Sequence, residues 1–286
     1  MDKDVPIPFE EQGLLYSTRV LMGNWFERRV LDDYKNQMGF RAMRHLERYR
    51  TMVENVHAPV KLSISMEKVI FGQKIMLVAP YILSTPCPLI KTKGMSLGSR
   101  VSPNYLPYAQ DFRPNFRIIG YKELEPLKKN TFIINQLIPD CSNDVLRYYQ
   151  PFTLTLAATV DEDKTPLHVR YIVNPMPGVT DPYPLELCDK PECATPWRIL
   201  PVRRSDITRE EQEGDIVPPN TDVIINHCAT NINLGMEPDI WIRDYYGHIA
   251  VPIVKTYVDV HKRELPNNIW QLRTELPQPE EIKKKT

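Results

Sequence analysis

Short β-branched and aromatic runs, separated by clusters of Asn, Gly and Pro, dominate the chain from about residue 61 onward. The clearest case is 222–272, where apolar runs at 223–225, 240–242, 251–254 and 269–272 alternate with polar clusters. Such runs are typical of strands, and the polar clusters between them are typical of turns. This stretch is therefore predicted to form four short strands.

The first and last of these strands have weaker copies earlier in the chain. Opening strands are predicted at 72–77, 149–154 and 220–225, and closing strands at 130–134, 195–199 and 268–272. Each closing strand has an aromatic residue at its centre, namely Phe132, Trp197 and Trp270. One such unit cannot cover its own apolar face, whereas three can close around a shared core. The repeat predicts a mainly β fold with a three-unit, β-trefoil-like core; a β-sandwich is the alternative.

The remaining segments divide the chain into four parts. We predict an irregular N-terminal arm at 1–18, a helical segment at 19–58, a β domain with insertions at 59–274 and a C-terminal tail at 275–286. Within the β domain, alternation predicts further strands at 62–66 and 69–78. Three proline-rich stretches, 79–115, 174–196 and 203–219, are expected to be long irregular insertions.

The helical segment carries a narrow apolar stripe between strongly basic faces. Such a helix suits docking onto an acidic partner, and the predicted partner-binding residues are Trp25, Arg28, Arg29, Arg41, Arg44 and Arg48. A solvated helix that packs on its own domain fits the same pattern.

Composition narrows the possible partners and compartments. The 36 Lys and Arg residues balance the 36 Asp and Glu residues, so no global field recruits nucleic acid or an anionic membrane. No apolar run approaches the roughly 20 residues that span a bilayer, and the acidic start lacks an apolar signal region. Five cysteines, an odd number, favour reduced thiols in the cytoplasm.

Several residues invite a catalytic or metal-binding interpretation. Cys188 and Cys193 would form half of a zinc site if His168 or the pair His227–Cys228 completed it, but no second paired knuckle occurs. A catalytic Cys228 activated by its neighbour His227 is also disfavoured, because adjacent residues in a strand point to opposite faces.

We instead expect His227, Thr230 and Asn231 to tie a turn. Nucleotide-binding, serine-hydrolase and metalloprotease motifs do not occur in the sequence. We predict a protein that is not an enzyme and needs no cofactor.

Three blocks resemble a known family. VLMGNW at 20–25 is similar to the family's N-terminal signature, and TFII at 131–134 followed by VLRY at 145–148 is similar to its central block. The third block is IINHCATN at 224–231, continued by Tyr246–Gly247, Thr256–Tyr257, His261 and Trp270. In this order, over about residues 19–273, they resemble the cilia- and flagella-associated protein 161 family.

Two departures from the family pattern stand out. A central Tyr-Gly-Gln of the family is Tyr148-Tyr149-Gln150 here, so a turn that depends on glycine must be built differently or shifted. The acidic stretch that follows Tyr246–Gly247 in the family is replaced by His248-Ile249-Ala250-Val251, which puts a charged contact there in doubt but not the strand.

The resemblance implies a structural microtubule inner protein in the lumen of axonemal doublet microtubules, in the cytoskeleton of motile cilia or flagella. It implies α- and β-tubulin and neighbouring inner proteins as partners, and a trefoil-like core related to the MIR-like repeats of intracellular calcium-release channels. The alternative function is a soluble β-trefoil module that binds a sugar or inositol phosphate. Trp241, Arg243 and Lys255 would supply its pocket.

Overall fold

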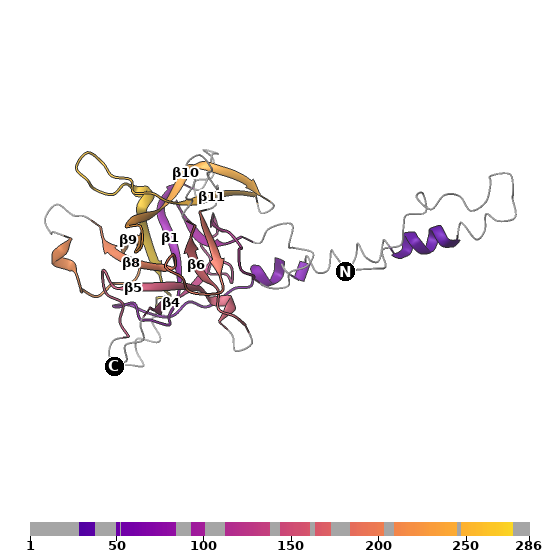
Figure 1. Cartoon of the computed structure of the whole chain (residues 1–286), viewed down its shortest axis with the longest axis horizontal. Coiled ribbons are helices and arrows are strands. Elements are labelled where there is room, and N and C mark those ends of the chain that lie inside the picture. The colour runs from indigo at the N-terminus through magenta and orange to yellow at the C-terminus, as the bar shows by residue number, and fades with distance from the viewer. Residues whose placement is uncertain are drawn as a thin grey trace. The chain divides into compact units, whose positions relative to one another are not determined.

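The computed structural model describes ten stretches of the chain: residues 29–37, 50–51, 53–83, 93–100, 112–137, 144–160, 164–172, 184–202, 209–244 and 247–276. For residues 83, 93, 238–244 and 247–249 it describes the backbone alone. The chain divides into two compact units, Met1–Thr51 and Met52–Thr286. Figure 1 shows the strands gathered in the second unit.

The N-terminal part is helical where it is described. Residues 29–37 form a helix in the first unit, and residues 50–51 and 53–56 are helical as well. The predicted N-terminal helical segment is therefore confirmed at these residues, while 38–49 lie outside the described part. None of the helices in the described stretches is both long and apolar enough to cross a membrane.

Strands are the main secondary structure in the described part of the second unit, which confirms a mainly β fold. The strands are β1 Lys74–Leu83, β2 Lys93–Ser99, β3 Ile118–Tyr121, β4 Thr131–Gln136, β5 Pro151–Leu156, β6 His168–Tyr171, β7 Leu185–Cys188, β8 Pro196–Pro201, β9 Asp222–His227, β10 Ile232–Asp244, β11 Gly247–Val254 and β12 Ile269–Arg273. Short 3-10 turns are η1 Ala157–Thr159, η2 Glu210–Gln212 and η3 Pro266–Asn268. All six predicted opening and closing strands are present, as β1, β5, β9 and β4, β8, β12 respectively.

The opening and closing strands form a closed antiparallel ring. β1 pairs with β4, β4 with β5, β5 with β8, β8 with β9, β9 with β12, and β12 with β1. The remaining strands pair as β2 with β3, β6 with β7, and β10 with β11. Closure leaves none of the six ring strands as an unpaired edge.

Three backbone hydrogen bonds form a cycle at one place in the core. The amide of Val69 donates to Val217 O (3.1 Å), Val217 donates to Leu146 O (3.1 Å), and Leu146 donates to Val69 O (2.9 Å). All three side chains are fully buried. Each residue lies five positions before an opening strand, so the cycle joins equivalent points of three units.

The turn into each opening strand uses a left-handed residue. The residues with positive φ are Gly72 (82°), Tyr149 (68°) and Asn220 (57°), each two positions before its strand. Their amides donate to Ile134, Ile199 and Leu272 of the closing strands. The glycine-dependent turn of the family is therefore not shifted; Tyr149 adopts the conformation that favours glycine.

The closing strands supply the largest core side chains. Phe132, Trp197 and Trp270 are each at most 1% exposed. The indole Nε1 of Trp197 donates to Val169 O (3.3 Å), and that of Trp270 donates to Leu234 O (2.9 Å). The predicted role of these aromatics as central core residues is confirmed.

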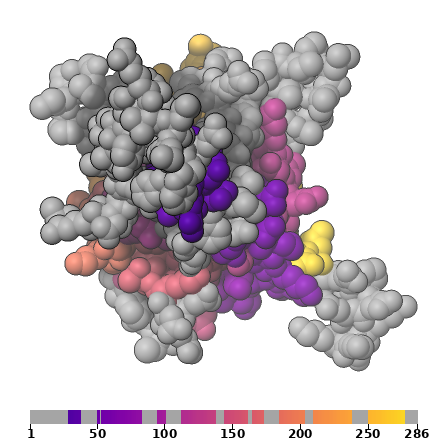
Figure 2. Space-filling model, turned by 90° about the vertical axis from the view of Figure 1, so that its right-hand side faces the viewer, coloured from indigo at the N-terminus to yellow at the C-terminus, as the bar shows by residue number. Residues whose placement is uncertain are grey.

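One predicted strand and two predicted insertions need correction. Residues 62–66 form no strand; Ile64 makes a single isolated bridge to Glu275. Figure 2 shows the purple part of the chain, to which these residues belong, on the surface. The expected irregular insertion at 79–115 contains the end of β1 and all of β2, and the insertion at 174–196 contains β7.

The strands inside these two expected insertions, β2 and β7, lack the composition that signals a strand. β2 has glycines at 94 and 98, and Gly98 is needed because a Cβ there would lie 2.9 Å from the Tyr121 ring. In β7 the acidic Glu186 interrupts the apolar run, and only partners far away in the sequence make its burial acceptable.

Candidate functional site

The predicted partner-binding residues fall mostly outside the described part of the chain. Trp25, Arg28, Arg41, Arg44 and Arg48 lie in residues that the structure does not describe. Arg29 is the first described residue of the helix at 29–37, and its side chain is exposed. The structure therefore places one of the six residues, on a helix as expected.

His227 ends β9 and holds the turn that follows it. Its Nε2 donates to Ala194 O at 3.1 Å, so Nδ1 accepts from the hydroxyl of Thr230 at 2.9 Å. Asn231 has a left-handed φ of 54°, and its amide donates to His227 O at 2.8 Å. The prediction that these three residues tie a turn is confirmed.

The environment of His227 opposes an acid–base role. Its ring packs edge-on against Trp197 and Tyr171, with ring centroids 4.9 and 5.2 Å away. Burial lowers the pKa of this histidine, so the imidazole is neutral near pH 7. Both ring nitrogens are already hydrogen-bonded, which makes His227 a structural residue.

Two of the three described cysteines, Cys188 and Cys228, are poor nucleophiles. Burial raises the pKa of Cys188 to about 11, and its Sγ contacts the carbonyls of His168 (3.4 Å) and Lys190 (3.2 Å). Burial also raises the pKa of Cys228. Cys193 is exposed. Thiols with a raised pKa carry little thiolate at neutral pH, and thiolate is both the nucleophile and the metal ligand.

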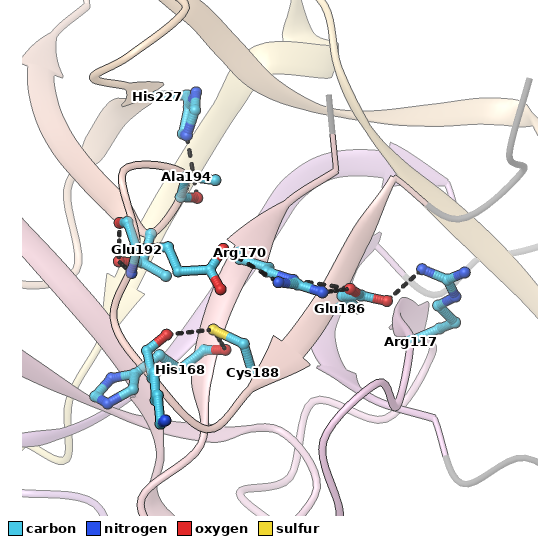
Figure 3. Close-up of polar contacts among 10 residues, drawn as sticks. Arg117, His168, Arg170, Glu186, Cys188, Glu192, Ala194 and His227 are labelled. Atoms are coloured by element: carbon cyan, nitrogen blue, oxygen red, sulfur yellow. Dashed lines mark hydrogen bonds and ion pairs between the residues drawn. The ribbon is translucent and has the colours of Figure 1, made fainter. Parts of the chain in front are cut away.

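A polar cluster that the sequence did not reveal joins three strands (Figure 3). The carboxylate of Glu186, in β7, accepts hydrogen bonds from two arginines. Arg117 Nη1 donates to its Oε2 at 2.6 Å, and Arg170 Nε donates to its Oε1 at 2.8 Å. Arg170 of β6 also contacts Glu192 at 3.2 Å. The Glu186 side chain is only 7% exposed, so its charge depends on both arginines. We call this set the Glu186 cluster.

The backbone around this cluster explains its geometry. Arg117 and Glu186 form an antiparallel bridge immediately before β3. The amide of Leu187 donates to Phe116 O (2.8 Å), and the amide of Asn115 donates to Leu187 O (2.7 Å). β7 is therefore held between β6 and the start of β3. Arg117 and Glu186 are too far apart in sequence for any motif search to pair them.

A second missed cluster surrounds a lysine. Lys129 is fully buried, and its Nζ lies 2.8 Å from Glu123 Oε2, 3.0 Å from His57 Nε2 and 3.9 Å from the centre of the Tyr121 ring. His57 Nδ1 donates to Val53 O at 2.9 Å, which leaves Nε2 to accept from the lysine. Burial lowers the pKa of Lys129, although Glu123 partly offsets this.

Lys129 therefore fastens the end of the helix at 53–56 to the strands. It contacts one acid, one imidazole and one aromatic face, and all three stabilise an ammonium ion. The arrangement thus joins two segments within the second unit.

The residues of the alternative ligand-binding function do not form a described site. Trp241 and Arg243 lie on β10 opposite Ala250 and His248, and for both only the backbone is described. Lys255 is exposed, and its Nζ lies 4.7 Å from the centre of the Tyr257 ring. Within the ten described stretches no three His, Cys, Asp or Glu side chains gather as metal ligands.

The fold and these clusters define a class: a β scaffold in which buried polar clusters, such as those of Glu186 and Lys129, hold separate segments together. Comparison with known proteins finds similarity to one family. Residues 184–275 match the model of the Cilia- and flagella-associated protein 161-like domain, a span that runs from β7 to β12.

Relatives that align with most of this chain have the same family name. The chain is 28% identical to Cilia- and flagella-associated protein 161 of Bos taurus, over 92% of this chain and 83% of that protein. It is 25% identical to the protein of the same name from Danio rerio, over 92% of this chain and 89% of that protein. The resemblance to this family inferred from the sequence is confirmed.

Solved structures offer a more distant likeness. The SDF2-like protein from Arabidopsis thaliana aligns with 74% of this chain and 99% of its own, at 13% identity and a TM-score of 0.44. A Caenorhabditis elegans protein of unknown function aligns with 73% of this chain and 97% of its own, at 10% identity and a TM-score of 0.46. At these scores the likeness assigns no function.

Proposed function

We propose that this protein is a structural microtubule inner protein, bound in the lumen of axonemal doublet microtubules, where it stabilises the doublet of motile cilia or flagella. The observation that carries the proposal is the similarity over 92% of the chain to proteins named for their association with cilia and flagella. The match to the family's domain supports it independently over 184–275.

The proposed architecture is a β-trefoil of the MIR-like kind. Three observations support it: the closed ring of six strands, the three outer strand pairs, and the cycle of hydrogen bonds through Val69, Leu146 and Val217. Each unit also enters the ring through a left-handed residue two positions before its opening strand. Three equivalent units around one axis form a compact rigid body, which suits a part that repeats along a polymer.

We also propose that the protein is not an enzyme and that its partners are α/β-tubulin and neighbouring inner proteins. The saturated hydrogen bonding of His227 and the raised pKa of Cys188 support the first part. The basic N-terminal segment, with Trp25, Arg41, Arg44 and Arg48, supports docking onto an acidic protein lattice.

Fractionation of axonemes tests the proposal. The tagged full chain, expressed in ciliated cells, should remain with doublets after detergent extraction and a high-salt wash that removes outer proteins. Recovery only in the soluble cell-body fraction would refute the luminal location.

A second variant tests the docking segment. Charge reversal at Arg41, Arg44 and Arg48 should reduce retention, because three contacts with an acidic surface become repulsive. Unchanged retention would show that this segment is not an anchor, without affecting the proposal for the protein as a whole.

A further inference from the structure

The connection between β11 and η3 is a rigid projecting loop. Over residues 255–265 (the gold loop in Figure 1) the chain runs out and returns as a short antiparallel ladder. Val258 bridges Glu264, the amide of Asp259 donates to Arg263 O (2.8 Å), and the amide of Leu265 donates to Tyr257 O (3.0 Å). Regular pairing on both sides gives this loop a defined shape. We call it the 255–265 loop.

The turn at its end is fixed by one carboxylate. Asp259 Oδ1 accepts the amides of His261 (2.8 Å) and Arg263 (2.9 Å), and the amide of Lys262 donates to Asp259 O (3.0 Å). Lys262 has a left-handed φ of 58°. These bonds hold the chain in one conformation at the tip, since the amides of His261, Lys262 and Arg263 all bond within the loop.

The base of the loop is anchored in the body. The side chain of Glu264 is 3% exposed and contacts Arg209 Nη2 at 2.6 Å. Arg209 Nε also donates to Pro201 O at 2.9 Å. On the other side Asn268 Oδ1 accepts the amide of Tyr257 at 2.6 Å, and the Tyr257 hydroxyl bonds to Glu237. A buried ion pair and a buried amide therefore fix the direction of the loop.

This rigid frame presents an apolar side chain to water. Val260 is 94% exposed, the largest value among the exposed large apolar side chains of the described stretches. Val258 is 45% exposed. The three residues that follow Val260, namely His261, Lys262 and Arg263, are exposed as well. Exposed valine gains nothing for folding, whereas an apolar side chain at a preorganised tip loses little entropy on binding.

We propose that the 255–265 loop is a docking element for a partner protein. Val260 enters a small apolar pocket of the partner, and Lys262 and Arg263 pair with acidic side chains at the rim of that pocket. The charges favour this partner, because two adjacent basic side chains follow the apolar one within three positions. A single valine is too small an apolar face for a membrane anchor. The proposed function locates the partner inside the doublet, but the docking chemistry stands apart from that location.

Three variants of the full chain test the loop. Val260→Ser is expected to lower retention in salt-washed doublets about tenfold, the effect of losing the burial of one valine side chain. The combination Lys262→Glu and Arg263→Glu should lower it at least as much. Val160→Ser is the matched control, since Val160 is 46% exposed but lies beyond η1. All variants should keep the melting temperature of the parent.

Photo-crosslinking separates the two proposals. Benzoylphenylalanine at position 260, in living ciliated cells, should give one discrete adduct whose mapped site lies beside Asp or Glu residues. The adduct should disappear with Lys262→Glu and Arg263→Glu, and position 160 should not give it. An adduct with a protein outside the axoneme upholds docking and refutes the luminal function.

Other outcomes overturn docking. Retention of Val260→Ser equal to that of the parent, or the same adducts from positions 260 and 160, would show that the loop makes no specific contact. Sedimentation of the full chain with phosphatidylserine vesicles, abolished by Val260→Ser, would identify a membrane-binding loop instead.

Discussion

Tyr149 occupies a backbone conformation in which glycine is strongly favoured. Its φ is 68°, between the values of the equivalent Gly72 (82°) and Asn220 (57°). Asparagine tolerates this region, whereas a tyrosine brings its Cβ too close to the carbonyl group. The amide of Tyr149 still donates to Ile199 O at 2.8 Å. The turn is thus retained although its central residue is unfavourable.

The strain is measured by comparing two truncations at the same site. Tyr149→Gly and Tyr149→Ala both remove the aromatic ring, so the difference in their free energies of unfolding reports the backbone. The left-handed conformation costs a residue with a Cβ about 1–2 kcal/mol, and the greater freedom of unfolded glycine offsets part of this, about 0.5–1 kcal/mol. We expect Tyr149→Gly to be more stable than Tyr149→Ala by roughly 0.5–1 kcal/mol.

The adjacent residue is a matched control. Gln150 is not among the described residues with positive φ, so the order should reverse there. Gln150→Ala should be more stable than Gln150→Gly by about 0.5–1 kcal/mol. Urea denaturation of the four variants, followed by tryptophan fluorescence, gives the differences at a common m-value. Alanine more stable than glycine at both positions would refute the strain at Tyr149.

Three further predictions concern the buried polar groups. Glu186→Gln should lower the free energy of unfolding by about 1–3 kcal/mol, because two partly exposed arginines lose their shared carboxylate; Glu192→Gln, at an exposed position, should cost less than about 0.5 kcal/mol by the same urea titration. Burial lowers the pKa of His227, so the unfolded chain binds its proton at a higher pH than the folded chain does. The stability that this group contributes is full above the ordinary pKa of 6.5 and is lost as pH falls through the lower folded value. Thermal melts at pH 7.5, 6.0 and 5.0 should show a smaller loss for His227→Gln than for the parent, and equal losses would count against a buried neutral imidazole. Finally, iodoacetamide at pH 8 should alkylate Cys193 well before Cys188 in peptide maps, since the pKa of Cys188 is about 11; equal rates would contradict its burial.

The ring strands were predictable because their signal is local. Each opening and closing strand is a run of β-branched or aromatic residues preceded by a turn, and Phe132, Trp197 and Trp270 mark the same position in three units. Burial on the inner face of a closed ring demands those residue types whatever surrounds the ring. The turn formed by His227 and Thr230 was predictable for the same reason, since its partners lie within four residues.

The clusters were not predictable because their partners are distant in sequence. Glu186 meets Arg117 across 69 positions, and Lys129 meets His57 across 72. Hydropathy shows Glu186 only as a charge inside a possible strand, which argues against the strand. In β2, Gly98 is a residue type typical of turns, yet it occupies a strand position at which a Cβ would collide with the ring of Tyr121. In each case a contact made by the completed fold overrides the local preference.

The three units have the same ring positions but differ in their outer structure. The unit of β1–β4 holds Lys129, which fastens the helix at 53–56; the unit of β5–β8 holds the Glu186 cluster; the unit of β9–β12 projects the 255–265 loop. Substitution in the ring changes the stability of all three units at once, because the cycle through Val69, Leu146 and Val217 joins them. Substitution in an outer feature leaves that cycle intact. The proposed contacts with several different neighbours therefore need recognition residues outside the ring, where the exposed Val260 lies and the buried Trp270 does not.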